Sequence, residues 1–139
     1  MATQHCRPQP VGATMDRMAI TSIQTITVLV SDQDRALAFF RAGLGFEVRA
    51  DNEFGDARGL TVAPVGGQTE LVLHLPFPGM TAGALRGTVL ATDDIDAACA
   101  RLNEVGTPVD GPDDVPWGRQ ATFADPDGNG FVLVQRHGE

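Results

Sequence analysis

The sequence contains no tyrosine, one tryptophan and only two cysteines, Cys6 and Cys99. Two cysteines give no disulfide framework. Cys99 lies inside an apolar helical pattern, and we expect it to be a small core residue. This cysteine usage favours a reducing, cytoplasmic location. No apolar run approaches the roughly 20 residues that a membrane span needs. The N-terminus also lacks the charged-then-apolar order of a secretory signal.

Positive charge is also scarce. The chain of 139 residues has 10 basic against 18 acidic residues, which gives a net charge of −8. Nucleic acids and anionic membranes both require a basic surface, so neither is a predicted partner. The acidity is compatible with a cationic ligand. We therefore expect a small molecule to be the partner.

Residues 1–18 are predicted to be a flexible N-terminal tail, because they show no periodicity and contain Pro8, Pro10 and Gly12. Met15 and Met18 are both candidate natural starts. Residues 19–139 are predicted to form one domain. Its length allows a core that buries about two-thirds of the unfolded surface.

A first βαβββ pattern spans about residues 20–80. The segment ITSIQTITVLV is rich in β-branched residues and indicates a strand, which ends at Ser31-Asp32. Either of these residues can cap a helix that Gly45 ends. Three further strands are indicated by FEVRADNEF, ARGLTVAP and QTELVLHL. The apolar side of the helix is predicted to carry Leu37, Phe40 and Leu44.

The same order returns over about residues 84–137. GTVLATDDIDAACARLNEVGTPV indicates a strand, an aspartate cap and a helix that ends near Gly106. PWGRQATFADPDGNGFVLVQ then indicates two more strands, joined at the DPDG turn. At an offset of 62 residues, Asp32 aligns with Asp94 and Gly66 aligns with Gly128. These matches fall at caps and turns in the same order, which indicates an internal duplication.

The duplication predicts an α+β fold. A four-stranded sheet with one helix on one face leaves its other face uncovered. Two such sheets can enclose a cleft, lined by side chains that alternate inward and outward along each strand. We therefore predict two tandem βαβββ modules forming a curved mixed sheet around a cleft.

The helix start VSDQDRALAFFRAGLGF and the finish FADPDGNGFVLV resemble the vicinal oxygen chelate superfamily, the glyoxalase, bleomycin resistance protein and extradiol dioxygenase group. The resemblance covers about residues 20–136. It implies the glyoxalase/bleomycin-resistance fold and a homodimer, whose cleft walls are built across the two chains. The group includes isomerases, epimerases, dioxygenases, transferases and metal-free drug binders, so the fold alone does not select a reaction.

The resemblance also implies where a metal would bind. The ligand positions of the metal-using members fall on Thr25, Glu70, Gly87 and Val132, and only Glu70 offers a strong donor. A catalytic divalent ion needs three or four ligands. The one histidine in a predicted strand is His74, and a Glu-x-x-x-His pair on one strand spans about 13 Å. We therefore predict no cofactor, with a divalent metal such as Zn, Ni, Mn or Fe as the alternative.

Several polar and aromatic residues are predicted to line the cleft. Glu70 is a candidate anchor for a cationic ligand or a general base, or else a polar remnant paired with Arg58, Arg119 or water. His74 on the same face is a candidate for ligand contact. Trp117 either stacks on a flat or cationic ligand or stabilises a turn. The complete predicted ligand-binding set is Thr25, Thr27, Glu70, His74, Trp117 and Arg119.

Two classes of function follow. The first is a metal-free binding protein of the bleomycin-resistance type, connected with antibiotic resistance, which holds a small cationic or aromatic molecule. The missing metal ligands, the acidity and the Glu70–Trp117 combination favour it. The alternative is a divalent-metal-dependent lyase, isomerase or dioxygenase of the glyoxalase group, which the fold favours and the ligand set opposes. A third reading is a protein with no tight ligand and a role in assembly.

Overall fold

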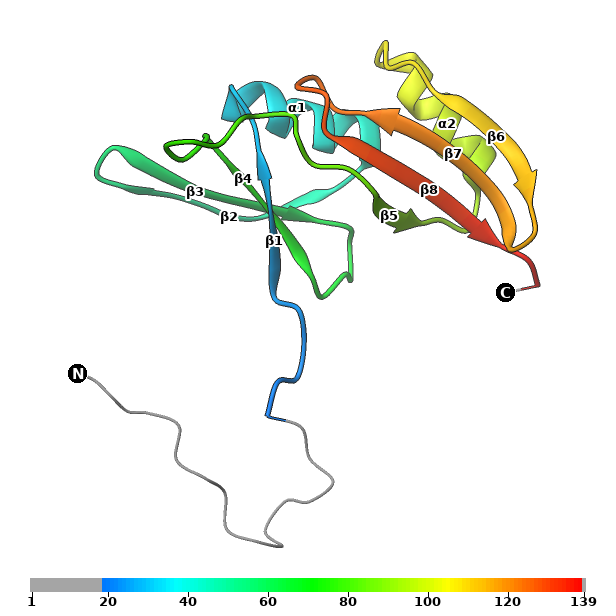
Figure 1. The fold of residues 1–139 in the computed structure, drawn as a ribbon, viewed down its shortest axis with the longest axis horizontal. Helices are drawn as coiled ribbons and strands as arrows, with labels where there is room; N and C mark the ends of the chain where they lie inside the picture. The colour runs from blue at the N-terminus through cyan, green and yellow to red at the C-terminus, as the bar shows by residue number, and fades with distance from the viewer. Residues whose placement is uncertain (1–18, 139) are drawn as a thin grey trace, which may run out of the picture.

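In a computed structural model of the protein, residues 19–138 form ten helices and strands in two modules (Figure 1). The structure describes residues 19–138, so the predicted tail over residues 1–18 lies outside the described residues. The first module contains β1 (Thr25–Leu29), α1 (Gln33–Leu44), β2 (Glu47–Phe54), β3 (Ala57–Ala63) and β4 (Glu70–His74). The second contains β5 (Thr88–Ala91), α2 (Ile95–Glu104), β6 (Asp110–Val115), β7 (Gly118–Ala124) and β8 (Gly130–Arg136).

Each module folds its four strands into its own sheet, and the two sheets have the same topology. Their strand orders are β1-β4-β3-β2 and β5-β8-β7-β6. The first strand of each module pairs in parallel with the last, and the remaining pairs are antiparallel. The predicted α+β fold with two βαβββ modules is therefore confirmed, as two four-stranded sheets lying beside one another (Figure 1).

Local sequence signals account for the helix boundaries. The side chain of Asp32 accepts a hydrogen bond from the backbone N–H of Arg35 at 3.1 Å, and Asp94 caps α2 through Ala97 in the same way. A side-chain oxygen at the N-cap satisfies a backbone donor that the helix leaves free. Gly45 ends α1 with φ of 72°, a left-handed conformation that glycine adopts without strain.

Two strand predictions differ from the structure. The first strand begins at Thr25, so the predicted segment from Ile20 is strand only in its second half. The second module also has an additional strand, β6, where we predicted none. Its sequence DGPDDV is polar and contains Pro112, which strand propensity disfavours. The strand forms because it lies at the edge of the sheet, with a register shift between Asp110 and Asp113.

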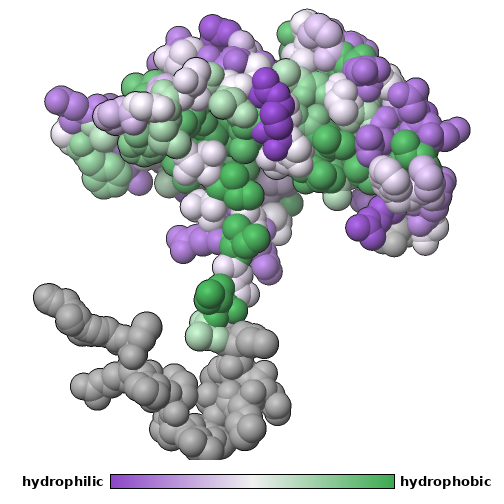
Figure 2. All heavy atoms as spheres, viewed as in Figure 1, coloured by the Kyte–Doolittle hydropathy of each residue, from purple (hydrophilic) through white to green (hydrophobic). Residues whose placement is uncertain are grey.

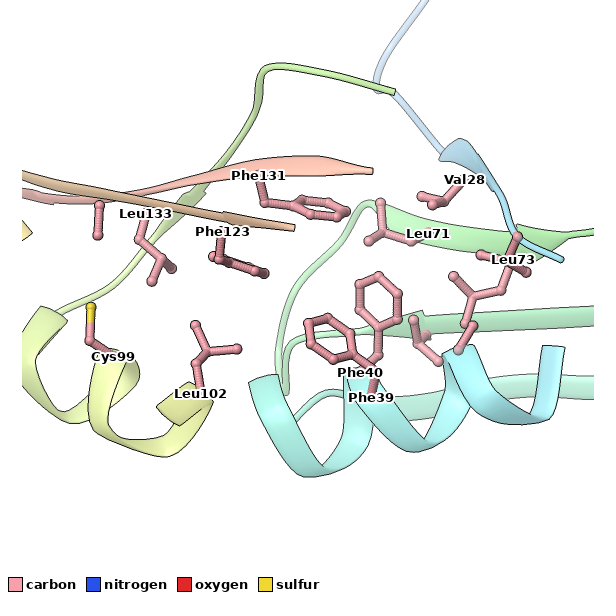
Figure 3. Close-up of a cluster of buried hydrophobic side chains, with 14 of the residues drawn as sticks. Val28, Phe39, Phe40, Leu71, Leu73, Cys99, Leu102, Phe123, Phe131 and Leu133 are labelled. Atoms are coloured by element: carbon pink, nitrogen blue, oxygen red, sulfur yellow. The ribbon is translucent and has the colours of Figure 1, made fainter. Parts of the chain in front are cut away.

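A shared hydrophobic core joins the two modules of the chain (Figure 3). Phe40 on α1 packs edge to face on Phe131 of β8, with ring centroids 5.8 Å apart. Phe39, which the predicted apolar side of the helix omitted, lies 6.2 Å from the ring of Phe123. Cys99 is a buried core residue as predicted, and desolvation raises the pKa of its thiol. Because α1 and α2 also contact one another, the modules pack through their helix-bearing sides.

Polar contacts hold the modules together at one end of this core. The DPDG turn of the second module receives the backbone N–H and hydroxyl of Ser31, which donate to the Asp127 carboxylate at 3.1 and 2.6 Å. Fully buried Asn129 donates to the carbonyl of Leu29 at 3.0 Å and accepts from the backbone N–H of Leu85 at 3.0 Å. This turn therefore fixes the end of β1 and the connector between the modules.

Candidate functional site

Four of the six predicted ligand-binding residues share the helix-free face of the first sheet. Along β4, Leu71 and Leu73 are buried in the core, so the alternating side chains of Glu70 and His74 lie on the opposite face. The parallel register places Thr25 beside Glu70, Thr27 beside Val72, and Leu29 beside His74. Thr25, Thr27, Glu70 and His74 therefore share one face of the first sheet, and their role in ligand binding stays a prediction.

Glu70 is paired with an arginine that the sequence analysis did not select. Arg49 Nη1 lies 3.5 Å from Glu70 Oε2, and Arg49 Nε donates to Glu47 Oε2 at 2.7 Å. The same guanidinium donates to the carbonyls of Pro64 and Gly67, each at 2.8 Å. The Arg49 guanidinium is therefore shared between two carboxylates and the turn that contains Pro64 and Gly67. The negative charge of Glu70 is compensated within the protein, which weakens its case as an anchor for a cation.

His74 stacks on the ring of Phe77, with centroids 4.4 Å apart and ring planes 18° apart. Its Nδ1 lies 2.6 Å from the carbonyl oxygen of Leu75. Because a carbonyl only accepts, Nδ1 carries the proton in this contact, and Nε2 of the neutral ring is left as an acceptor. The histidine thereby contacts the start of the connector and stacks on Phe77.

Trp117 lies on the second sheet, in the turn between β6 and β7. Its Nε1 donates to Gln120 Oε1 at 3.2 Å, and the residue is 55% exposed. Ala121 and Phe123 are buried in the core, so Gln120 lies on the helix-free face by alternation. The β6–β7 turn is far from β1 in the same chain (Figure 1). One chain alone therefore does not bring Trp117 to the residues of the first sheet.

Arg119 lies on the other side of the second sheet. Its guanidinium donates to Asp96 of α2 at 2.8 Å and also faces Asp114. This contact lowers the pKa of the Asp96 carboxyl. Arg58 occupies the equivalent place in the first module, paired with Asp51 and Asp34. Both arginines therefore link a sheet to its helix, and the structure separates Arg119 from the other predicted ligand-binding residues.

An apolar cleft of about 630 Å³ opens at the end of β1, beside the helix-free face of the first sheet. Thr27 and Leu29 form its wall on β1, and the connector between the modules supplies most of the rest. Figure 2 shows hydrophobic residues exposed along β1 and near β5, on either side of the connector. Apart from Thr27, none of these residues belonged to the set predicted from the sequence. The one signal in the sequence that could have identified them is a set of large apolar side chains in the Pro/Gly-rich segment LPFPGMTAGALRG. The described residues that line the cleft are Thr27, Leu29, Phe77, Met80, Thr81, Ala84, Leu85 and Asn129.

The residues at the family's metal positions do not fit a catalytic divalent ion. The parallel register pairs Val132 with Val89, as it pairs Glu70 with Thr25. The metal position on β5 is therefore Val89 rather than the predicted Gly87. The set is then Thr25, Glu70, Val89 and Val132, with one carboxylate that already contacts Arg49. Over residues 19–138, no group of three or more His, Cys, Asp or Glu side chains is placed to hold a metal. Three such ligands are the usual minimum.

Paired βαβββ modules, each with a helix-free face and a shared apolar cleft, define the glyoxalase/bleomycin-resistance class of fold. The family comparison agrees, because the Glyoxalase/Bleomycin resistance protein/Dioxygenase superfamily model matches residues 22–133. The chain belongs to this superfamily, which is the vicinal oxygen chelate superfamily. Over the described residues, no helix is long and apolar enough to cross a membrane.

Solved structures and one curated relative resemble the chain over most of its length. TnmS3, an antibiotic binding protein from Streptomyces sp. CB03234, is 52% identical, with a TM-score of 0.82 over 86% of this chain and 99% of that one. A superfamily member from Sphaerobacter thermophilus is 41% identical, with a TM-score of 0.79 over 86% of this chain and 100% of that one. Uncharacterized protein YetH of Bacillus subtilis is 32% identical, over 84% of this chain and 99% of the relative.

Proposed function

We propose that this protein binds a small, mostly apolar aromatic antibiotic in the cleft, without a metal, and holds it unchanged. The observation that carries the proposal is the lining of the cleft, where Phe77, Met80 and Leu29 surround only a few polar groups. Ligand pockets are commonly apolar with a small number of polar groups that orient the ligand. The similarity to TnmS3, an antibiotic binding protein, supports the same class of ligand.

The charges favour an aromatic ligand over a cationic one. Glu70 is compensated by Arg49, and Asp96 by Arg119. Among residues 19–138, no carboxylate lines the cleft. A phenyl ring and a methionine thioether both make favourable contacts with aromatic rings. The alternative, a divalent-metal-dependent lyase, isomerase or dioxygenase, receives no support from the residues at the metal positions.

A homodimer would complete the site. In one chain the modules pack through their helix-bearing sides, and β1 and β5 are both edge strands. The helix-free faces therefore stay unpaired within the described chain. Trp117 is half exposed on the second sheet, away from the cleft. In the proposed homodimer, the second sheet of one copy lies over the first sheet of the other and brings Trp117 to the ligand.

Leu29→Glu tests the proposed cleft directly. With the neutral aromatic dye N-phenyl-1-naphthylamine as probe, we expect the unmodified protein to bind saturably. The variant should bind at least about tenfold more weakly, because it places a carboxylate in an apolar site. Dye fluorescence titrations measure both affinities. The matched control is Val65→Glu, at an exposed position outside the cleft lining. Equal affinities for the two variants, or no dye binding to the unmodified protein, would contradict the proposal.

A further inference from the structure

The cleft has two walls that differ in how firmly they are held. One wall comes from β1, Leu85 and Asn129. Asn129 is fully buried and bonds to both Leu29 and Leu85. The other wall consists of Phe77, Met80 and Thr81, which belong to the segment Leu75–Ala82 of the connector (Figure 1, the green chain between β4 and β5). The wall formed by β1, Leu85 and Asn129 is therefore held by buried hydrogen bonds.

Among the described residues, the backbone hydrogen bonds to the rest of the protein hold the segment Leu75–Ala82 at its two ends. Before it, the carbonyl of His74 accepts from the backbone N–H of Val30 at 2.8 Å. After it, the N–H of Gly83 donates to Leu29 at 3.2 Å. The Arg86 guanidinium also bonds to the carbonyls of Gly83, Leu85 and Gly128. A Cβ on Gly83 would lie against the Asp127 carbonyl, so this anchor packs too tightly for any larger residue.

Between these anchors, few bonds hold the segment. Among residues 19–138, the hydrogen bonds that reach it are the contact of His74 Nδ1 with the Leu75 carbonyl and the bond from the Met80 N–H to the Phe77 carbonyl. The first is at the boundary, and the second lies within the segment. Backbone that makes few bonds to the rest of a protein opens at low free-energy cost.

The second of these bonds closes a tight turn with the sequence Phe-Pro-Gly-Met. Pro78 and Gly79 occupy its central positions, and Gly79 has φ of 82°. Proline followed by a glycine with positive φ is the pattern of a type II turn. The turn presents Phe77 and Met80 together at its base, and both line the cleft. They are 46% and 56% exposed, so each keeps apolar surface that a ligand could cover.

We propose that Leu75–Ala82 is a lid that closes on the bound ligand by burying Phe77 and Met80 against it, while β1, Leu85 and Asn129 stay fixed. This rests on the proposed function and adds to it the element that grips the ligand. The side chains that the lid contributes are a phenyl ring and a thioether. The ligand class it fits is therefore a molecule with a flat aromatic face. The stack of Phe77 on His74 holds the lid when no ligand is present.

Hydrogen exchange with N-phenyl-1-naphthylamine as probe tests the lid. We expect saturating dye to slow exchange of the amides in Leu75–Ala82 about fivefold or more, while the amides of β1 change little. Phe77→Ala should increase the dissociation rate of the dye about tenfold, since it removes the main apolar contact of the lid. The matched control is Phe54→Ala, at an exposed position outside the cleft lining.

The outcomes separate the lid from the proposed function. Absence of dye binding to the unmodified protein would overturn both. Dye binding that Leu29→Glu weakens, with unchanged exchange in Leu75–Ala82, would overturn the lid and leave the binding function standing. Equal dissociation rates for Phe77→Ala and Phe54→Ala would also overturn the lid. Slower exchange confined to the segment, together with faster release from Phe77→Ala, is the expected result.

Discussion

Phe40→Ala is expected to lower the free energy of unfolding by about 3–5 kcal/mol, the largest effect of any substitution considered for this protein. Phe40 is fully buried and its ring packs on those of Phe39, Phe46 and Phe131. Truncation removes these contacts and leaves a cavity between α1 and β8. Urea denaturation at neutral pH measures the change.

The control for this substitution is Phe54→Ala. Phe54 is 65% exposed at the end of β2, so its truncation should cost less than about 1 kcal/mol. The comparison matters because Phe40 joins the two modules of one chain. Similar unfolding energies for the two variants would mean that α1 does not pack on the second module as described.

Asn129→Ala is expected to lower the free energy of unfolding by about 2–4 kcal/mol, although it removes no large side chain. The substitution leaves the Leu85 N–H and one oxygen of the buried Asp125 carboxylate without their side-chain partner. Buried polar groups that lose their partners cost more than an ordinary hydrogen bond contributes. The measurement is again urea denaturation. Because Asn129 borders the cleft, dye affinity should fall as well.

Two further variants test whether the cost of Asn129→Ala comes from the lost hydrogen bonds. Asn103→Ala, on the exposed side of α2, should change stability by less than about 0.5 kcal/mol. Asn129→Asp keeps the shape but loses the Nδ2 donor that bonds to Leu29 and Asp125, so it should cost at least as much as the alanine variant. An Asn129→Asp variant as stable as the unmodified protein would contradict the assigned hydrogen bonds.

The parts of the fold that the sequence predicted correctly depend on local signals. Asp32 and Asp94 cap their helices because a short side-chain oxygen reaches the free backbone donors of the first turn. Gly45 ends α1 because its left-handed conformation excludes most other residues. These signals recur in both modules, so the duplication was visible. Strand β6 was missed because edge pairing with β7 overrides its poor strand propensity.

The site was predicted only in part, because several contacts depend on register and packing. Alternation along β4 grouped Glu70 with His74, which needs no tertiary information. Arg49 was missed because a register shift between Val48 and Ala50 redirects its side chain. Val89 replaced Gly87 because the alignment of the two modules does not fix the strand pairing. Phe77 and Met80 lie in a connector, where no periodicity marks a functional side chain.

Ligand binding with and without metal, followed by the mass of the recovered ligand, distinguishes a metal-free binding protein from an enzyme. An aromatic antibiotic that displaces N-phenyl-1-naphthylamine would be titrated in EDTA, and separately with Zn²⁺, Ni²⁺, Mn²⁺ or Fe²⁺. A metal-free binding protein will show the same Kd in every condition, and the recovered ligand will have an unchanged mass. Binding that requires one of the metals, or a product of altered mass, would contradict it and indicate an enzyme of the glyoxalase group.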